Sequence, residues 1–421
     1  MEQPKACIIM IAYYFPPDSG IGGIRPFRFY KYLKKMGYEC TVITASAQSA
    51  PAPSDIVVVP DEIGKIWASA KRPQLSFLAH VERLVRRFGI PACTGVIWAK
   101  DVTAVCLDLI RRHHPDRPII VYTTYPPLGT LLAGLIIAWR RRVAWICDFR
   151  DPMSPGSSVN YSAFSRFLAR RLESSAFHTA DAVIANTKAM AQEWFDVYPL
   201  AGHKLHVIFN GFDPEQQPRA REIPPRTWRV IIHAGELYGG RKPDIILESL
   251  ARLRETSAPA RGVRILLQGS IGHEGDMPKV LAEKATRDGW LQINARSIPR
   301  AEALRLIEES DGLLLLQPQS AIQVPGKLFD YVCVGRPILA LVPRSSAVEE
   351  ILKQAGVPNV CVYSDDGGEV VDRKLLTYLE LPAQPMPLSD SFETAFNVAH
   401  QTKQLSTIID ALRHHRIRKK P

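Results

Sequence analysis

The chain has 421 residues, and 53 Lys and Arg against 42 Asp and Glu give it a formal net charge of +11. This length predicts about two domains, and a hydrophobic content of 46% is typical of an ordinary soluble protein. The longest apolar stretch, 128–139, is shorter than the roughly 20 residues that span a bilayer, which excludes membrane-spanning helices. Seven cysteines without a Cys-x-x-Cys pair predict reduced, cytosolic thiols and no zinc cluster.

Short apolar runs alternate with helical stretches along the first half of the chain. Residues 6–12 form the first expected strand, which favours a strand and its loop over a signal peptide. A helix is expected at 26–36, and Gly37 closes it. Alternation of this kind predicts a doubly wound parallel sheet, whose further strands are expected at 39–44, 56–59, 119–122, 143–148, 182–184 and 205–208.

A second series of the same kind follows a Pro-rich, non-periodic segment at 213–227, which is expected to be a linker. The expected domains are residues 1–212 and 228–394, with a C-terminal helix at about 395–421 that packs back on the first domain. The predicted fold class is α/β, with two Rossmann-like doubly wound parallel-sheet domains facing a cleft. The second domain has expected strands at 229–233, 263–268, 291–294, 312–316, 338–342 and 360–363, and expected helices at 244–255, 278–287, 300–309 and 347–354. Helical spacing returns at 390–412.

Positive charge is concentrated in the first half. Residues 1–212 hold 25 Lys and Arg against 16 Asp and Glu, a net charge of +9. An anionic partner is therefore expected, and a phospholipid membrane fits because anionic bilayers attract basic residues. Nucleic acid fits the charge equally well, but it is not expected because aromatics are not interleaved with the basic runs and no nucleic-acid motif is present. A solvated basic surface is the remaining interpretation. The basic runs lie at 25–35, 71–87, 140–142 and 166–171.

A glycine-rich turn follows the first strand and opens the first helix. Gly22 and Gly23 let the backbone approach a ligand closely, and Arg25 lies at the mouth of the turn. The spacing fits the dinucleotide fingerprint poorly, and no acidic residue ends the second strand. Contact with a phosphate or a sugar is the favoured interpretation, and a plain tight turn is the alternative.

Two carboxylates and a guanidinium, those of Asp148, Arg150 and Asp151, lie at the end of the expected strand 143–148. Carboxylates in a dry site can bind sugar hydroxyls or act as a base. A structural pair between Arg150 and Asp151 is the rival interpretation. The preceding strand-end loop contains Tyr125 and is able to line an acceptor pocket.

Strand-end loops of the second half combine glycine with positive charge. Gly235 is followed by Arg241 and Lys242 at the expected start of a helix, where dipole, N–H groups and full charges attract a diphosphate. A solvated basic helix start is the alternative. Gly269 permits close backbone approach after the next strand, and Ile298 either flanks a nucleotide base or belongs to the core.

The segment 323–340 is the most informative in the chain. Pro325 and Gly326 fix the start of a short helix, and Lys327 adds a full positive charge to that start, which suits a phosphate. Asp330, one turn along on the same face, can accept hydrogen bonds from ribose hydroxyls. Together these residues predict a nucleoside diphosphate site. The alternative is an ordinary helix–strand connection with a surface Lys and Asp.

Several catalytic motifs are missing from the sequence. No His/Asp/Glu cluster has metal-ligand spacing, and neither the Gly-x-Ser-x-Gly nucleophile motif nor the P-loop motif occurs. The hydrolase and ATPase classes therefore lack their reacting groups, and no metal or other cofactor is expected.

Five short motifs follow one another along the chain. They are Tyr-Phe-Pro-Pro-x-x-Gly-x-Gly-Gly (14–23), Asp-Phe-Arg-Asp-Pro (148–152), Val-Ile-x-Asn-Gly-Phe-Asp (207–213), Gly-x-Leu-Tyr (235–238) and Pro-Gly-Lys-Leu-Phe-Asp-Tyr followed by Gly-Arg-Pro (325–337). In this order they resemble the family 4 glycosyltransferases of the GT-B fold, over nearly the whole chain, and most closely the branch found in bacterial surface-polysaccharide clusters. The resemblance implies a nucleotide-sugar donor bound mainly by the second domain and an acceptor bound by the first. It also implies transfer with retention of anomeric configuration and no required metal.

The resemblance also implies roles for single residues. Arg241 stands where the family has a diphosphate-binding Lys, and Asp330 stands where it has the Glu that holds the ribose. Gly22 and Gly23 match the phosphate-facing loop, and Asp148 lies near the position of the donor-contacting His.

Two positions depart from the family pattern. Glu236 replaces the usual phosphate-binding Arg, and Ile322 replaces the first of the paired glutamates, so Lys327 is expected to supply the missing charge. The expected catalytic residues are Asp148, Arg241 and Lys327. The expected donor-binding residues are Gly22, Gly23, Gly235, Arg241, Lys242, Gly269, Ile298, Lys327 and Asp330, and the expected acceptor-binding residues are Arg25, Tyr125, Arg150 and Asp151.

The sequence and the resemblance together predict a glycosyltransferase that moves a sugar from a nucleoside-diphosphate sugar to a lipid-linked or oligosaccharide acceptor. The expected location is the cytoplasm, peripheral to the inner face of the plasma membrane. A nucleotide-sugar epimerase of the same fold and a non-catalytic nucleic-acid-binding protein are the alternatives.

Overall fold

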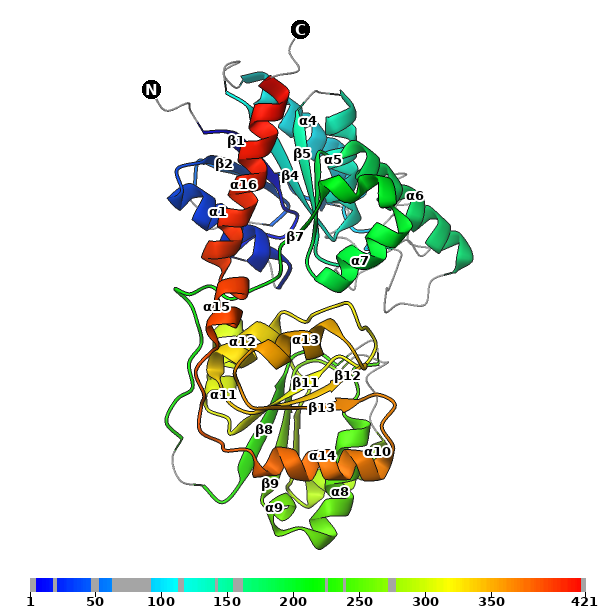
Figure 1. Cartoon of the computed structure of the whole chain (residues 1–421), viewed down its shortest axis with the longest axis vertical. Helices are drawn as coiled ribbons and strands as arrows, with labels where there is room; N and C mark the ends of the chain where they lie inside the picture. Colours follow the sequence, from blue (N-terminus) through cyan, green and yellow to red (C-terminus); the bar gives the residue numbers. More distant parts are fainter. Residues whose placement is uncertain are drawn as a thin grey trace. The chain divides into compact units, whose positions relative to one another are not determined.

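The computed structural model describes residues 5–17, 21–46, 53–62, 92–112, 117–140, 143–153, 162–223, 226–237, 240–271 and 278–417. The chain divides into two compact units (Figure 1). The first consists of Met1–Asn210 and Val398–Pro421, and the second of Gly211–Asn397. The basic run 71–87 lies outside the described residues.

The first unit is built on a seven-stranded sheet in the order β3-β2-β1-β4-β5-β6-β7, with every neighbouring pair parallel. Its strands are β1 (Cys7–Ile11), β2 (Glu39–Thr44), β3 (Ile56–Val58), β4 (Ile119–Tyr125), β5 (Ala144–Phe149), β6 (Ala182–Ala185) and β7 (Leu205–Val207). The helices are η1 (Ile21–Gly23), α1 (Ile24–Lys35), α4 (Trp98–Arg112), α5 (Leu128–Arg140), α6 (Ala163–Thr179), α7 (Lys188–Val197), η2 (Pro199–Lys204) and α16 (Val398–Ile417).

The second unit has a six-stranded parallel sheet in the order β10-β9-β8-β11-β12-β13. Its strands are β8 (Arg229–Ala234), β9 (Val263–Gln268), β10 (Leu291–Asn294), β11 (Gly312–Leu316), β12 (Ile338–Val342) and β13 (Asn359–Tyr363). Its helices are α8 (Asp244–Thr256), α9 (Ala258–Arg261), α10 (Lys279–Arg287), α11 (Arg300–Glu308), α12 (Lys327–Val334), α13 (Ala347–Gln354), α14 (Gly368–Glu380) and α15 (Asp390–Phe396). The predicted class of two doubly wound parallel sheets is confirmed.

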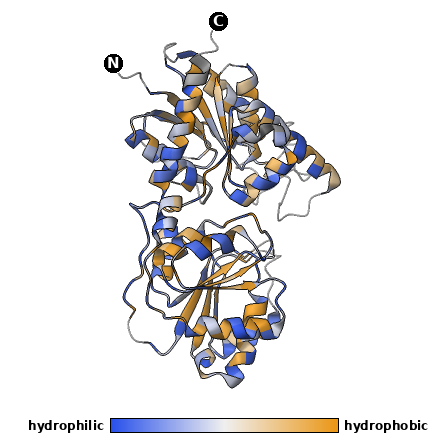
Figure 2. Cartoon of the chain, in the orientation of Figure 1, coloured by the Kyte–Doolittle hydropathy of each residue, from blue (hydrophilic) through white to orange (hydrophobic). Residues whose placement is uncertain are grey.

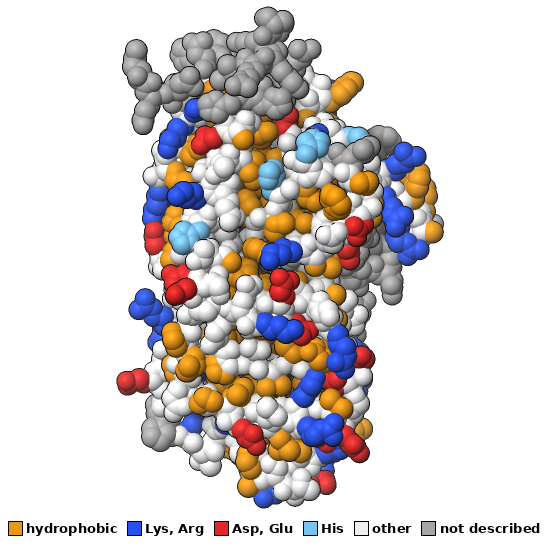
Figure 3. All heavy atoms as spheres, in the orientation of Figure 1, with side chains coloured by type: hydrophobic (Ala, Val, Ile, Leu, Met, Phe, Trp, Pro, Cys, Tyr) orange, Lys and Arg blue, Asp and Glu red, His pale blue; other side chains and the backbone are white. Residues whose placement is uncertain are grey.

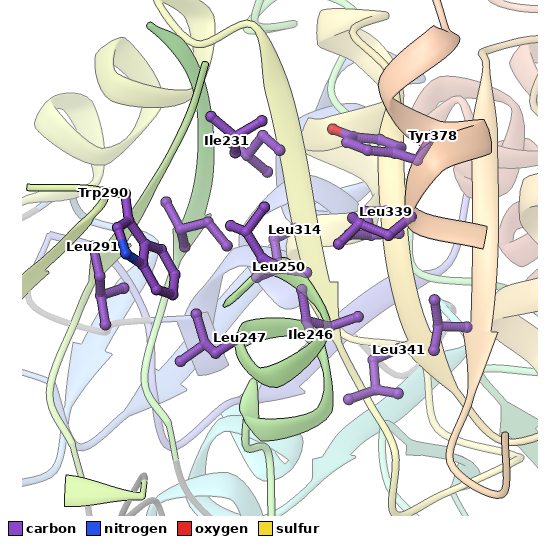
Figure 4. Close-up of a cluster of buried hydrophobic side chains, with 14 of the residues drawn as sticks. Ile231, Ile246, Leu247, Leu250, Trp290, Leu291, Leu314, Leu339, Leu341 and Tyr378 are labelled. Atoms are coloured by element: carbon purple, nitrogen blue, oxygen red, sulfur yellow. The ribbon is translucent and has the colours of Figure 1, made fainter. Parts of the chain in front are cut away.

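Burial on both faces of the sheets explains why the strands are runs of apolar residues. In β1, β11 and β12 every residue is buried, as expected for parallel strands covered on both faces. Figure 2 shows the strands as hydrophobic and the outer helix faces as largely hydrophilic. In the second unit, Leu247 and Leu250 of α8 pack with Leu314 of β11, Leu339 of β12 and Tyr378 of α14 (Figure 4).

Strand β4 is longer than expected. It ends at Tyr125 and not at residue 122, because Thr124 and Tyr125 continue the parallel pairing with Asp148 and Phe149 of β5. Tyr125 is therefore a buried strand residue, with 2% of its surface exposed, and not a loop residue.

The C-terminal helical segment is interrupted. Residues 390–412 were expected to be helical throughout, but Asn397 has extended backbone angles (φ −70°, ψ 119°) and forms a bridge with Phe212. The break separates α15, in the second unit, from α16, whose Leu405 and Ile409 are buried in the core of the first unit.

The segment 213–227 lies in the second unit and is anchored along it. Arg221 Nε donates to Glu308 at 2.8 Å, and Arg226 Nε donates to Asp311 at 3.0 Å. Arg336 Nη2 also donates to the carbonyl of Arg221 at 2.7 Å.

Each sheet has one point where the winding direction reverses. It lies between β1 and β4 in the first unit and between β8 and β11 in the second. In doubly wound sheets, ligands bind at the carboxyl ends of the strands at this point. The loops after β1, β4, β8 and β11 are therefore where a site is sought.

Candidate functional site

In the second unit, glycines allow the loops after β8 and β9 to pack against each other. A Cβ atom on Gly269 (φ +145°) would lie 2.4 Å from the carbonyl oxygen of Gly235. Gly235 N donates to the carbonyl of Gln268 at 2.7 Å, and Leu237 N donates to that of Ser270 at 3.0 Å. Gly235 and Gly269, both predicted as donor-binding, are thus neighbours at the carboxyl edge of the sheet.

Lys327, the first residue of α12, lies over Gly235. A Cβ atom at Gly235 (φ +144°) would be 2.0 Å from Lys327 Nζ, so only glycine leaves room for the lysine. Lys327 Nζ is 3.2 Å from Nε2 of His233, a buried residue of β8. Since His233 Nδ1 donates to the carbonyl of Leu314 at 2.9 Å, Nε2 carries the lone pair and accepts from the lysine.

Burial and neighbouring charge change the proton affinity of both groups. Burial, followed by the charge of Lys327, lowers the pKa of His233 well below its ordinary value, so the ring is neutral. Burial, followed by the positive charge of Arg241, lowers the pKa of Lys327 to about 7, against an opposite effect from Glu236. Arg241 and Lys327 therefore repel each other, and an anion bound between them would relieve that repulsion.

Helix α12 is fixed to β8, and this holds Lys327 in place. The buried hydroxyl of Tyr331 accepts a hydrogen bond from Ala234 N at 2.9 Å. Leu328 N donates to the carbonyl of Pro325 at 3.0 Å, which closes the first turn. Gly326, at the N-cap, offers no side-chain acceptor to the helix, so the dipole of α12 adds positive potential beside Lys327.

Asp330 lies one turn after Lys327 and is nearly buried, at 7% exposure. Its Oδ1 accepts from Arg300 Nη2 at 2.8 Å, and Arg300 is the first residue of α11. Ile298 lies two residues before Arg300 and is half-buried. The predicted ribose and base contacts are thus on neighbouring elements, and Arg300 is a further charged residue among them.

Arg241 and Lys242 lie in the loop after β8, as predicted, and both are half-buried. Lys242 N donates to the carbonyl of Gly240 at 2.9 Å. A Cβ atom on Gly240 (φ +75°) would lie 2.1 Å from Gln319 Nε2, so the loop that carries Arg241 packs against the loop after β11. Gly235, Arg241, Lys242 and Lys327 thus lie in or next to the loops at the carboxyl edge where β8 and β11 part, whereas Gly269 and Ile298 follow β9 and β10.

In the first unit, Arg25 and Asp148 form a buried bidentate ion pair. Arg25 Nε and Nη2 each donate to Asp148 at 2.8 Å, and exposures are 7% and 0%. Tyr122 Oη donates to the same carboxylate at 2.5 Å. Arg25 also donates to the carbonyls of Ile208 at 2.8 Å and Phe209 at 2.6 Å.

This network gives Arg25 and Asp148 a positioning function. Burial opposes the charge of Arg25, but Asp148 beside it raises the pKa of Arg25 above its ordinary value, so the guanidinium is charged. The carboxylate is fully enclosed by its partners. The predicted substrate contacts of both residues stay predictions, and the contacts present join α1, β5 and the segment after β7.

Arg150 connects the remaining predicted residues of the first unit. Its Nη1 donates to the carbonyl of Gly22 at 2.5 Å, its Nη2 donates to that of Pro126, and its backbone N donates to that of Tyr125 at 2.8 Å. Gly22 has no room for a side chain, because a Cβ atom would lie 2.7 Å from the ring of Tyr14. The loops after β1, β4 and β5 therefore meet.

Two other predicted residues flank this group. Gly23 is buried at the start of α1, and Asp151 is half-buried next to Arg150. The rival prediction of a structural Arg150–Asp151 pair is supported by the charge of Asp151, which raises the pKa of Arg150 against the larger lowering effect of burial.

His233 and Arg300 were not predicted as site residues. His233 was visible only as the end of an apolar strand, and Arg300 only as a helix start. The signal that could have identified His233 is a polar side chain near the carboxyl end of a buried strand, next to the point where the strand order of the sheet reverses.

In the described part of the chain, every helix is too short or too polar to cross a bilayer. Over the same ranges, no three His, Cys, Asp or Glu side chains come together as a metal site.

The comparison with protein families gives one match. Residues 27–216 match the family described as Glycosyltransferase Family 4, a range that covers less than half of the chain. D-inositol 3-phosphate glycosyltransferase from Streptosporangium roseum is 26% identical over 171 residues, which are 35% of this chain and 39% of that protein. The chain thus spans about two fifths of the length of the curated relative it matches.

Solved structures match over nearly the whole chain. HepE from Anabaena, in complex with UDP and glucose, is 15% identical with a TM-score of 0.58, over 96% of this chain and 100% of that one. Sucrose-phosphate synthase from Thermosynechococcus elongatus is 12% identical with a TM-score of 0.60, over 98% of each chain. At this identity the likeness shows the fold, and with the two parallel sheets it confirms the predicted GT-B class.

Proposed function

We propose that this chain is a retaining, metal-independent glycosyltransferase that moves a sugar from a nucleoside-diphosphate sugar to a glycan acceptor. One observation carries the proposal: Lys327 is held over Gly235, next to Arg241, where β8 and β11 part. The family match of residues 27–216 and the likeness to HepE, whose structure contains UDP and glucose, support the same activity.

The chemistry follows from the charges. The leaving diphosphate gains negative charge as the glycosidic bond breaks, and fixed cations beside it lower the barrier. Lys327, Arg241 and the start of α12 supply positive potential at one place. Asp330 would accept hydrogen bonds from the ribose, which would compete with Arg300 for the same carboxylate. Ile298 would flank the base.

The acceptor side of the proposal rests on the first unit. We assign the acceptor to the loops that Arg150 joins, around Tyr125 and Gly22. A lipid-linked glycan of a bacterial surface polysaccharide is the proposed acceptor, and the proposed location is the cytoplasmic face of the plasma membrane. The excess of basic residues in the first half supports this location.

The first test is a thermal-shift panel with UDP-, GDP-, ADP- and TDP-sugars, followed by turnover of the donor that binds. Lys327→Ala and Arg241→Ala should each lower turnover by about a hundredfold or more, and Asp330→Ala should raise the KM for the donor. Lys353→Ala is the control, since Lys353 is exposed on α13 and paired with Glu349. Normal turnover in Lys327→Ala would contradict the diphosphate role.

Product analysis separates the proposed activity from the alternatives. A glycosyltransferase releases the nucleoside diphosphate and forms a glycoside whose anomeric configuration NMR can compare with the donor. An epimerase returns a nucleotide sugar and needs no acceptor. Tight, salt-sensitive binding of nucleic acid without donor turnover would end the preference for an enzyme.

A further inference from the structure

Helix α6 presents aromatic and basic side chains on one exposed face. Phe164 and Phe167 are 51% and 53% exposed although each is a large apolar side chain. They are three residues apart, so both point from the same side of the helix. Arg171 follows one turn later, with its guanidinium over the Phe167 ring at 5.3 Å from the centroid. Figure 3 shows basic and hydrophobic side chains side by side over α6.

The charge of this face has one sign. Arg170 and Arg171 are exposed, and the helix sequence contains a single acidic residue, Glu173. Glu173 is fully buried on the opposite face, where it accepts from Met153 N at 3.0 Å and from Tyr198 Oη at 3.1 Å. The exposed face therefore combines the two positive charges of Arg170 and Arg171 with two phenyl rings and no carboxylate of the helix.

The core of the unit does not use this face. The helix is attached through its other side, by Ala169, Ala176 and Phe177, each at most 1% exposed. Its start is capped by Ser162, which accepts from Ser165 N at 3.1 Å. Packing among the described residues thus accounts for the buried face, and Phe164 and Phe167 lie outside that core.

The start of α6 lies near the loops of the first unit that Arg150 joins. Helix α6 follows β5, and it ends where Asp181 N donates to the carbonyl of Trp145 at 2.9 Å, near the beginning of β5. The first turns, with Phe164 and Phe167, therefore lie toward the carboxyl edge of the sheet, the edge that carries Tyr125 and Arg150.

We propose that the exposed face of α6, formed by Phe164, Phe167, Arg170 and Arg171, docks the chain on an anionic phospholipid bilayer. Phenyl rings enter the boundary between headgroups and acyl chains, while arginines on the same face pair with lipid phosphates. Such a surface would bring the acceptor loops to a lipid-linked substrate. Only this last point, the delivery of a lipid-linked substrate to the acceptor loops, rests on the proposed function.

Vesicle co-sedimentation tests the proposal with the full chain and without donor or acceptor. The wild type should bind phosphatidylcholine vesicles in which roughly a third of the lipid is phosphatidylglycerol. It should bind vesicles of pure phosphatidylcholine much less. Phe164→Ser with Phe167→Ser, and separately Arg170→Ser with Arg171→Ser, should each lower the partition coefficient by about tenfold or more. Circular dichroism checks that each variant is folded.

The chain offers a matched control for each double variant. Arg111→Ser with Arg112→Ser removes the same charge from exposed positions of α4, and Phe195→Ser removes an aromatic of equal exposure, 51%, from α7. Both controls should bind like the wild type. Equal losses in the arginine control would show a general charge effect and overturn the assignment to α6. Absence of wild-type binding to anionic vesicles, or retained binding in both α6 variants, would also overturn it.

The two proposals fail separately. Vesicle binding does not depend on turnover, and donor turnover on a soluble acceptor should be unchanged in the α6 variants. If the α6 variants instead lose binding to an acidic protein or a nucleic acid while vesicle binding is unaffected, the bilayer is the wrong occupant.

Discussion

Lys327 occupies its position because Gly235 has no side chain and because His233 presents a lone pair to it. Neither of these two neighbours carries a negative charge, and the repulsion from Arg241 exceeds the attraction from Glu236. A lysine in these surroundings gains more from an incoming phosphate than a solvated lysine would, because its charge is poorly compensated beforehand. The same surroundings make its charge sensitive to pH.

Donor affinity should fall as the pH rises through about 7. Only the charged form of Lys327 attracts the diphosphate, and its pKa in the ligand-free protein is lowered to about 7. It is charged below that pH and increasingly neutral above it, so binding at pH 8 requires uptake of a proton. The Kd for the nucleoside diphosphate should rise by up to about tenfold per pH unit above 7.

Calorimetry at pH 8 in buffers of different ionisation enthalpy measures the proton uptake directly. His233 does not contribute over this range because burial lowers its pKa well below the ordinary value. In Lys327→Met the pH dependence should disappear. A Kd that is constant from pH 7 to pH 9 in the wild type would contradict the proton-linked role.

Gly235→Ala should weaken donor binding more than it destabilises the fold. The new methyl group would stand 2.0 Å from Lys327 Nζ and displace it, in addition to a backbone strain of about 1–3 kcal/mol for a non-glycine residue at this positive φ. Gly289→Ala is the control, because Gly289 also has a positive φ (+77°) but no atom within 4 Å of the added Cβ. Isothermal titration and urea denaturation of both variants separate displacement from strain. Equal donor affinity in the two variants would refute the displacement.

At the scale of elements, buried polar contacts define how helices and strands are joined. Arg25 of α1 reaches Asp148 of β5 across 123 residues of sequence, and it reaches the carbonyls after β7. Tyr331 joins α12 to the end of β8 in the same way. Each contact fixes the carboxyl edge of its sheet, where the candidate sites lie.

Loss of one partner of the Arg25–Asp148 pair should be costly. Arg25→Met leaves a fully buried carboxylate without its cationic partner and should lower the free energy of unfolding of the first unit by about 3–5 kcal/mol. Lys34→Met is the control, since Lys34 pairs with Asp55 at the surface, with 47% and 23% exposure, and such a pair contributes about 1 kcal/mol or less. Urea denaturation measures both, and a loss below about 1 kcal/mol in Arg25→Met would refute the structural role.

The sequence predicted the strands better than it predicted the ends of the helices. Thirteen strands could be predicted because parallel strands covered on both faces are continuous apolar runs. Helix α14 was not predicted, although its Val371, Leu375 and Tyr378 are buried. The break at Asn397 was also missed, because helical spacing continues through it and only the bridge to Phe212 interrupts it.

The candidate sites could be predicted as loops, but their contacts could not. Glycine, charge and strand ends located Gly235, Arg241 and Lys327. That His233 supports Lys327, 94 residues away, depends on the pairing of β8 with β11 and on the placement of α12. Pairing between distant segments leaves no local pattern in a single sequence.

At the scale of the whole molecule, the chain leaves the first unit after Asn210 and returns to it at Val398. Leu405 and Ile409 of α16 pack with Ile8, Met10 and Tyr122 in one core. Two units with separate cores need not unfold together, so a single free energy of unfolding does not describe this chain.

Leu405→Ala should destabilise the first unit alone. Leu405 is fully buried, and removal of three buried carbons costs about 2–5 kcal/mol. Hydrogen exchange measured by mass spectrometry should show faster exchange in β1 and β4 and no change in β8 and β11. Leu375→Ala, in the core of the second unit, is the matched control and should do the reverse. Exchange that changes in both sheets would refute independent cores.

The return of the chain through α16 has a consequence during synthesis. Every strand and helix of the second unit has been translated before Leu405 is, whereas the sheet of the first unit still lacks part of its cover. The half made first is therefore completed last, and a nascent chain that stalls before α16 leaves the apolar side of β1 and β4 open to chaperones.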